Sequence, residues 1–150
     1  MTTVISVRGR NRRDLEADPS FVYVGRRCRG WPGSIWGNPF GRVMPRAKTD
    51  FQAALFSGWL REQGLAMAIL ATAPKSSGIT EASASEARRL ILERLPELRG
   101  KTLGCWCGDW RPGEPEIPCH AVVLANLANA IEDVVGDREC RIVVGARSQG

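Results

Sequence analysis

Short strand-like runs, separated by segments with helical signals, constrain the fold of this chain more than any other feature. The runs are Val4–Val7, Phe21–Val24 and Lys101–Cys107. Antiparallel strands are joined by tight turns, whereas parallel strands need a long crossover that usually contains a helix. We therefore expect an α/β protein: a small Rossmann-like layer fold with a mostly parallel sheet flanked by helices. We expect residues 1–150 to form a single domain, with a loose tail over 136–150 or a last strand over Arg141–Gly145.

Four segments carry the helical signals. Two of them open on patterns typical of capping boxes, Thr49 to Gln52 and Ser83 to Glu86, in which side chains bond free N–H groups of the first turn. Helices are also predicted over Leu65–Ala73 and Cys119–Val135. The helix after Thr49 carries an apolar stripe at helical spacing, which is expected to place Trp59 in the core. Its members are Phe51, Ala54, Leu55, Gly58 and Trp59.

Two polar segments, Arg8–Ser20 and Arg26–Lys48, are predicted to be loops. The second is long and rich in Gly and Pro, and such connections are usually functional or disordered. Its tryptophans argue against disorder, because indole rings need burial or a ligand. Guanidinium groups can clamp a phosphate and an indole can stack on a base. The predicted ligand-binding residues are Arg26, Arg27, Trp36, Gly37, Asn38, Pro39 and Phe40. The alternative is a rigid turn in which Asn38 caps its own loop while Trp36 and Phe40 fill the core.

A cluster of cysteines and the only histidine marks the predicted chemistry. Cys105, Cys107, Cys119 and His120 lie within sixteen positions of the sequence. Ligands of open α/β sheets bind beyond the carboxyl ends of strands, so the strand-end and helix-start halves are expected to meet there. Trp106 is expected on the opposite face from its two neighbours. The favoured interpretation is a zinc site with three thiolates and one imidazole. The alternatives are a Cys–His catalytic pair and thiols that merely pack.

Positive charge concentrates in the first third of the chain. Residues 1–50 carry ten Lys and Arg against four Asp and Glu, a net charge of +6, and the whole chain carries +5. A nucleotide or nucleic acid would meet this third. The arginines between Arg8 and Arg13 are expected to form a solvated charge run.

Cysteine usage and hydropathy indicate the compartment. No apolar run approaches the roughly 20 residues of a membrane span, and the N-terminal residues lack a secretory pattern. Five cysteines without a regular spacing favour a reducing environment over a disulfide framework. We therefore expect a cytoplasmic protein with no membrane partner, in which Cys28 and Cys140 are incidental.

Several motifs occur in order between about Val4 and Ile131. They are Val22-Tyr-Val-Gly-Arg26, Trp36-Gly-Asn-Pro-Phe40, the Trp59-Leu60 helix, Leu98-Arg-Gly-Lys101, and Gly104-Cys-Trp-Cys107 with Cys119-His120. Together they resemble an uncharacterised bacterial and phage family, catalogued only as a domain of unknown function. The resemblance implies a shared fold and site but supplies no activity. This chain departs from the family where Ala121-Val122 replaces Gly-Asp, and in a longer loop over Gly108–Pro118.

These features favour a protein, an enzyme of unassigned reaction or a sensor, that binds a nucleotide, nucleoside or nucleic-acid base through the basic Trp/Asn loop. The Cys/His cluster would be its metal or reactive site. The alternatives are a nucleic-acid-binding module with a structural metal and a phage or host protein-interaction module. A zinc deaminase is disfavoured, because the required second cysteine does not follow Cys119 and no glutamate lies two residues after His120. A P-loop and a dinucleotide fingerprint are absent from the sequence.

Overall fold

The computed structural model describes residues 1–115 and 119–131. The predicted tail, the strand over Arg141–Gly145 and Cys140 lie outside the described residues. None of the described helices is both long and apolar enough to cross a membrane.

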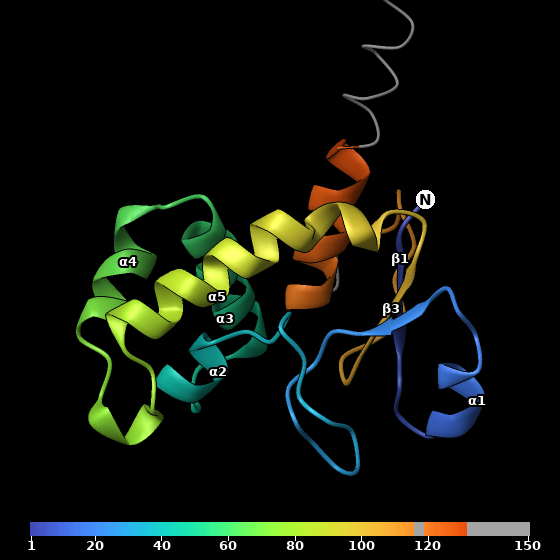
Figure 1. The fold of residues 1–150 in the computed structure, drawn as a ribbon, viewed down its shortest axis with the longest axis horizontal. Helices are drawn as coiled ribbons and strands as arrows, with labels where there is room; N and C mark the ends of the chain where they lie inside the picture. Colours follow the sequence, from blue (N-terminus) through green and yellow to red (C-terminus); the bar gives the residue numbers. More distant parts are fainter. Residues whose placement is uncertain (116–118, 132–150) are drawn as a thin grey trace, which may run out of the picture.

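A three-stranded parallel sheet forms one side of the molecule (Figure 1). Its strands are β1 (Thr3–Ser6), β2 (Phe21–Tyr23) and β3 (Thr102–Cys105). The order is β1-β3-β2, so the last strand along the chain inserts between the first two and pairs parallel with both. The predicted α/β class with a parallel sheet is therefore confirmed. All three strands end at the same edge of the sheet, which we call the carboxyl edge.

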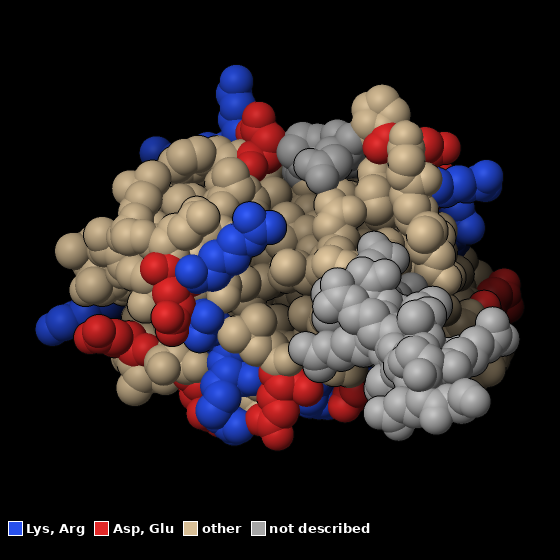
Figure 2. Space-filling model, turned by 90° about the horizontal axis from the view of Figure 1, so that it is seen from above, with Lys and Arg blue, Asp and Glu red and all other residues tan. Residues whose placement is uncertain are grey.

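The helices lie mainly on the other side of the molecule. They are α1 (Arg12–Glu16), α2 (Phe40–Val43), α3 (Thr49–Leu60), α4 (Gly64–Ala71), α5 (Glu81–Arg94) and a last helix over 120–131, with 3-10 turns at Lys75–Ser77 and Leu95–Leu98. In Figure 1 the last helix, drawn in orange, stands between α2–α5 and the sheet, and α1 lies beyond the sheet. Seen from above, basic and acidic side chains are intermixed along the lower rim of the molecule (Figure 2).

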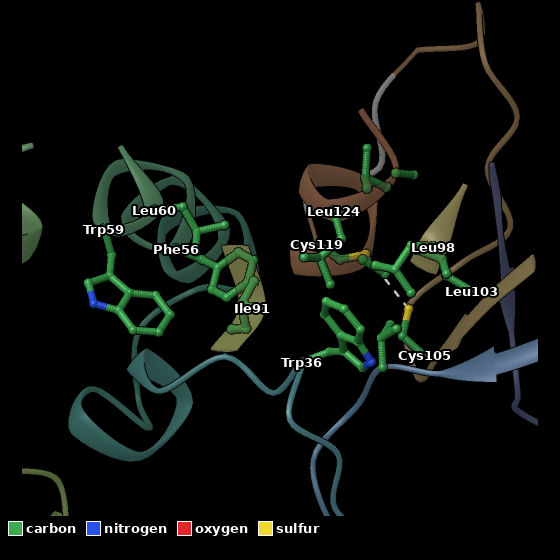
Figure 3. Close-up of a cluster of buried hydrophobic side chains, with 14 of the residues drawn as sticks. Trp36, Phe56, Trp59, Leu60, Ile91, Leu98, Leu103, Cys105, Cys119 and Leu124 are labelled. Atoms are coloured by element: carbon green, nitrogen blue, oxygen red, sulfur yellow. Dashed lines mark hydrogen bonds between the residues drawn. The ribbon is translucent and has the colours of Figure 1, made fainter. Parts of the chain in front are cut away.

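The core fills the space between the helices and the sheet. Phe56, Trp59 and Ile91 from the helical side and Leu103 from β3 are almost fully buried, which confirms the prediction for Trp59 (Figure 3). The last helix is tied to the start of the sheet because the Asn129 side chain accepts from the backbone N–H of Thr2 at 2.8 Å and donates to its carbonyl at 3.2 Å.

Gly104 lets the sheet pack closely beside the cysteine cluster. A Cβ atom at this position would lie 2.5 Å from the ring of Phe21 and 2.9 Å from Cγ1 of Val7. Contacts this short do not occur between real side chains, so residue 104 must lack a side chain for both neighbours to sit against β3.

The capping of α3 and of α5 differs from the sequence predictions. α3 begins at Thr49 as expected, but Lys48 is its N-cap, and Gln52 donates to the carbonyl of Met44 instead of closing a capping box. α5 begins earlier than predicted, because Thr80 and Ser83 form the capping box. Ser83 belongs to both the predicted and the observed capping box, but in the structure it is the third residue of α5 and not its N-cap.

Two loop predictions were wrong in part, and so was the apolar stripe. α1 lies inside the predicted loop Arg8–Ser20, where the Asn11 side chain caps its first turn. α2 lies inside the second loop and begins directly after Pro39. On α3, Phe51 and Ala54 are exposed, because the face that meets the core is instead formed by Ala53, Leu55, Phe56, Trp59 and Leu60.

Candidate functional site

Residues from all three strand ends meet at the carboxyl edge. Arg8 follows β1, Gly25 and Arg26 follow β2, and Cys105 ends β3 with Trp106 and Cys107 directly after it. These residues line one cavity of about 220 Å³. This is where ligands bind in open α/β sheets, so the predicted position of the cysteine cluster at a strand end agrees with the structure.

The three thiols of Cys105, Cys107 and Cys119 form a compact group, the three-cysteine cluster. Their sulfur atoms all lie within 4.8 Å of one another. Cys105 Sγ and Cys119 Sγ are 3.7 Å apart and face each other across the core (Figure 3). The backbone N–H of Cys107 donates to Cys105 Sγ at 3.4 Å, so the chain turns back on itself directly after β3.

The thiols differ in exposure and in acidity. Cys105 and Cys119 are buried, whereas Cys107 is half-buried. The pKa of Cys107 is well below that of a free thiol, because the thiols of Cys105 and Cys119 donate hydrogen bonds to its sulfur. The pKa of Cys105 is raised correspondingly, since its proton is held in its hydrogen bonds to Cys107 and Cys119 and burial disfavours its charged form. Of the three thiols, Cys107 is therefore the one whose thiolate form is favoured.

His120 lies next to the three-cysteine cluster in sequence but is not part of it. Its Nε2 is 2.7 Å from the carbonyl oxygen of Val24, and its ring meets Phe56 edge to face at 5.6 Å. Burial lowers the pKa of His120, so the neutral ring is favoured. The structure thus brings together three of the four predicted metal ligands, while the fourth lines the same cavity.

Trp106 lies on the opposite face of the strand from Cys105, as predicted, because its indole meets Tyr23 while Cys105 faces Cys119. Gly104 faces the Phe21 ring on the Trp106 side, which is the face that alternation along β3 gives to residue 106. The indole Nε1 donates to the Tyr23 hydroxyl at 3.2 Å, and that hydroxyl donates to the carbonyl of Arg26 at 2.7 Å. Trp106 lines the cavity and connects β3 to the start of the basic loop.

The segment Trp36-Gly-Asn-Pro-Phe40 forms a rigid turn, which is the alternative to ligand binding that its sequence allows. Asn38 Oδ1 accepts from the N–H of Phe40 at 3.0 Å, and its Nδ2 donates to the carbonyl of Gln52 at 3.1 Å. Trp36 is only 4% exposed and Phe40 is fully buried. Gly37 bonds back to Ser34, and Pro39 precedes α2.

The predicted ligand residues therefore separate into three groups. Arg26 and Asn38 line the cavity, whereas Arg27 lies in a different, open hollow. Trp36, Gly37, Pro39 and Phe40 line neither hollow. A ligand-binding role for all seven stays a prediction.

Besides Trp106, sequence reasoning missed Arg8, Gly41, Thr49 and Gln52 as lining residues of the cavity. Arg8, expected in a solvated run, and Gln52, expected in a cap, both line it. A signal for Arg8 was available, because it directly follows the Val4–Val7 run whose carboxyl end points to this edge. Gln52 is the fourth residue of α3, and no pattern in the sequence indicates that its side chain lies at the carboxyl edge.

Comparisons with known proteins identify the family of this chain. The chain belongs to the family described as domain of unknown function (DUF4326), whose family model matches residues 7–130. A protein of Acanthamoeba polyphaga mimivirus, described as uncharacterized protein R718, is 30% identical over 139 residues, covering 88% of this chain and 85% of that protein. No solved structure matches the chain.

Proposed function

We propose that this member of the family binds a nucleotide or nucleoside in the cavity at the carboxyl edge, with a zinc ion held by the three-cysteine cluster in the cavity wall. One observation carries the proposal: three thiols within 4.8 Å of one another stand beside two arginines that line the same hollow. The proposal assumes a reducing cytoplasm, where such thiols persist.

The sulfur geometry supports zinc. A tetrahedral zinc with Zn–S bonds of about 2.3 Å separates its sulfurs by about 3.8 Å, and Cys105 Sγ lies 3.7 Å from Cys119 Sγ. Three protein ligands leave a fourth position for water or a bound molecule, which is typical of catalytic zinc rather than structural zinc. Cys105 and Cys107 both line the cavity, so that molecule would come from the cavity side.

The remaining lining supports a small anionic ligand with an aromatic part. The guanidinium groups of Arg8 and Arg26 suit a phosphate, and Trp106 offers a ring face. The cavity, at about 220 Å³, is below the range of about 300–1,000 Å³ found for most small-molecule sites. It therefore suits a single base or nucleoside better than a dinucleotide cofactor.

A second candidate is a cysteine nucleophile without metal. Cys107 is the half-buried thiol of the cluster, it lines the cavity, and its lowered pKa favours the thiolate. A thiolate beside bound substrate is the arrangement that covalent catalysis requires.

Metal analysis of reduced, freshly purified protein tests the zinc site. We expect one zinc per chain in the wild type and in Cys28→Ser, the matched control, whose thiol lies outside the cluster. We expect far less in Cys107→Ser and Cys119→Ser. A wild type without stoichiometric metal refutes the zinc site. Rapid alkylation of Cys107 alone, below pH 7, would then favour the nucleophile.

Titration calorimetry with nucleoside 5′-monophosphates tests the ligand. A hydrogen bond to a charged group contributes about 1.5–3 kcal/mol, so Arg26→Ala should weaken binding roughly ten- to hundredfold. Arg61→Ala, an exposed arginine at the end of α3, should leave the affinity unchanged. Equal affinities of the two variants, or no binding by the wild type, would contradict the proposal.

A further inference from the structure

An open hollow of about 670 Å³ lies next to the cavity in the chain's basic loop. Arg27, Arg29 and Trp31 are part of its lining. The loop contributes an arginine to each hollow, because Arg26 lines the cavity and Arg27 lines the open hollow. Arg29 connects them: its guanidinium carbon lies 5.7 Å from the ring centre of Trp106, which lines the cavity.

The loop holds Arg29 in a fixed and unusual conformation. Cys28 and Trp31 exchange backbone hydrogen bonds of 3.2 and 2.9 Å around a two-residue turn. Both residues of that turn have positive φ, 42° at Arg29 and 87° at Gly30, as in a type I′ turn. Glycine or asparagine is favoured where Arg29 stands. Trp31 anchors the turn by stacking on Tyr23 with ring centres 4.5 Å apart.

Four arginines on this surface form what we call the basic edge. They are Arg8, Arg26, Arg27 and Arg29, all of them exposed. Within residues 1–115 and 119–131, no carboxylate forms an ion pair with any of them, whereas the nearby Arg10 and Arg12 pair with Asp109 and Glu16. Arginines without carboxylate partners over two adjoining hollows favour an extended polyanion.

We propose that the protein binds single-stranded nucleic acid along the basic edge, with one nucleotide in the cavity and the neighbouring phosphates on Arg27 and Arg29. This inference rests on the proposed function and names its substrate class. A free nucleotide in the cavity would leave the open hollow and its arginines unused. A base within a duplex could not enter a cavity of this size, so the strand must be unpaired at that point.

Fluorescence anisotropy with a labelled dodecanucleotide, as DNA and as RNA, tests the inference beside calorimetry with the mononucleotide. The wild type should bind at least one oligonucleotide more than tenfold tighter than the mononucleotide. Charge reversal in Arg27→Glu/Arg29→Glu should remove that gain and flatten the slope of log K against log salt by about 1.4, since each phosphate contact of a single strand contributes about 0.7. Mononucleotide affinity should fall far less than oligonucleotide affinity, because neither Arg27 nor Arg29 lines the cavity.

Two further variants keep the test decisive. Arg61→Glu/Arg99→Glu reverses the same charge at exposed arginines away from the basic loop, and should retain the oligonucleotide affinity. Arg29→Gly removes the guanidinium while suiting the positive φ, so it should weaken oligonucleotide binding without loss of folding.

The outcomes separate this inference from the proposed function. Mononucleotide binding with no gain from a longer strand overturns this inference alone. An equal loss in the control variant also overturns it, because net charge would then explain the binding. If neither mononucleotide nor oligonucleotide binds, both proposals fail.

Discussion

Replacing Gly104 by alanine tests the packing that supports the cysteine cluster. The added Cβ would lie 2.5 Å from the Phe21 ring and 2.9 Å from Val7 Cγ1, so at least one of these side chains must move. Overpacking of this kind typically destabilises a protein by about 1–3 kcal/mol. Alanine recovers about 0.4–1 kcal/mol through its smaller loss of backbone entropy. We therefore expect Gly104→Ala to lower the free energy of unfolding by about 1–2 kcal/mol.

Urea denaturation at equal zinc content, with thermal melts alongside, measures the effect. For a chain of this size the loss corresponds to a fall in Tm of about 2–8 °C. Gly64→Ala is the matched control, because a Cβ there meets nothing within 4 Å and alanine suits the first turn of α4. In a Phe21→Ala background the cost of Gly104→Ala should shrink by at least 1 kcal/mol. An unchanged or higher stability of Gly104→Ala, or no coupling to Phe21, would refute the reasoning.

Three more changes give measurable outcomes. Burial lowers the pKa of His120, so the stability that depends on its neutral ring is full above about pH 6.5 and is lost as pH falls through the folded-state pKa. His120→Gln should remove this pH dependence of the free energy of unfolding. In NMR, the single histidine resonance should titrate below the usual pKa of histidine. Thr2→Val should cost about 1–3 kcal/mol in denaturation, because the buried hydroxyl donates to the Leu98 carbonyl at 2.8 Å. Asn38→Ala should cost a similar amount and weaken nucleotide binding together with stability, and a stable variant with intact binding would show that the turn does not shape the cavity.

The sheet and the position of the site could be predicted because they depend on local signals. Runs rich in β-branched and aromatic residues predicted β1 and β2, and the short run Lys101–Cys107 predicted β3. Parallel pairing brings the carboxyl ends of all three strands to one edge whatever the loops do. The location of Cys105 and Cys107 followed from this topology alone. The side on which Trp106 lies followed as well, because the alternation of β3 continues through residue 106 to its contact with Tyr23.

The loop was harder to interpret because burial is a tertiary property. Trp36 and Phe40 have the same chemistry in a ligand site and in a core, and only the arrival of α3 and the last helix decides between them. The Asn38 hydrogen bonds show how the turn is stabilised: one is local, to Phe40, but the other reaches Gln52 on α3. A pattern confined to the loop cannot contain that second partner.

The separation of His120 from the cluster follows from helix geometry. Cys119 stands immediately before the helix over 120–131, where its carbonyl accepts from the N–H groups of Val122 and Val123. Neighbouring side chains at a helix start diverge by about 100°, so one of the pair faces Cys105 while the other faces the Val24 carbonyl. Only one of two adjacent residues can then reach a shared metal without unwinding the turn. The fourth position of a zinc ion in this cluster would therefore belong to water or ligand, which couples the metal directly to what occupies the cavity.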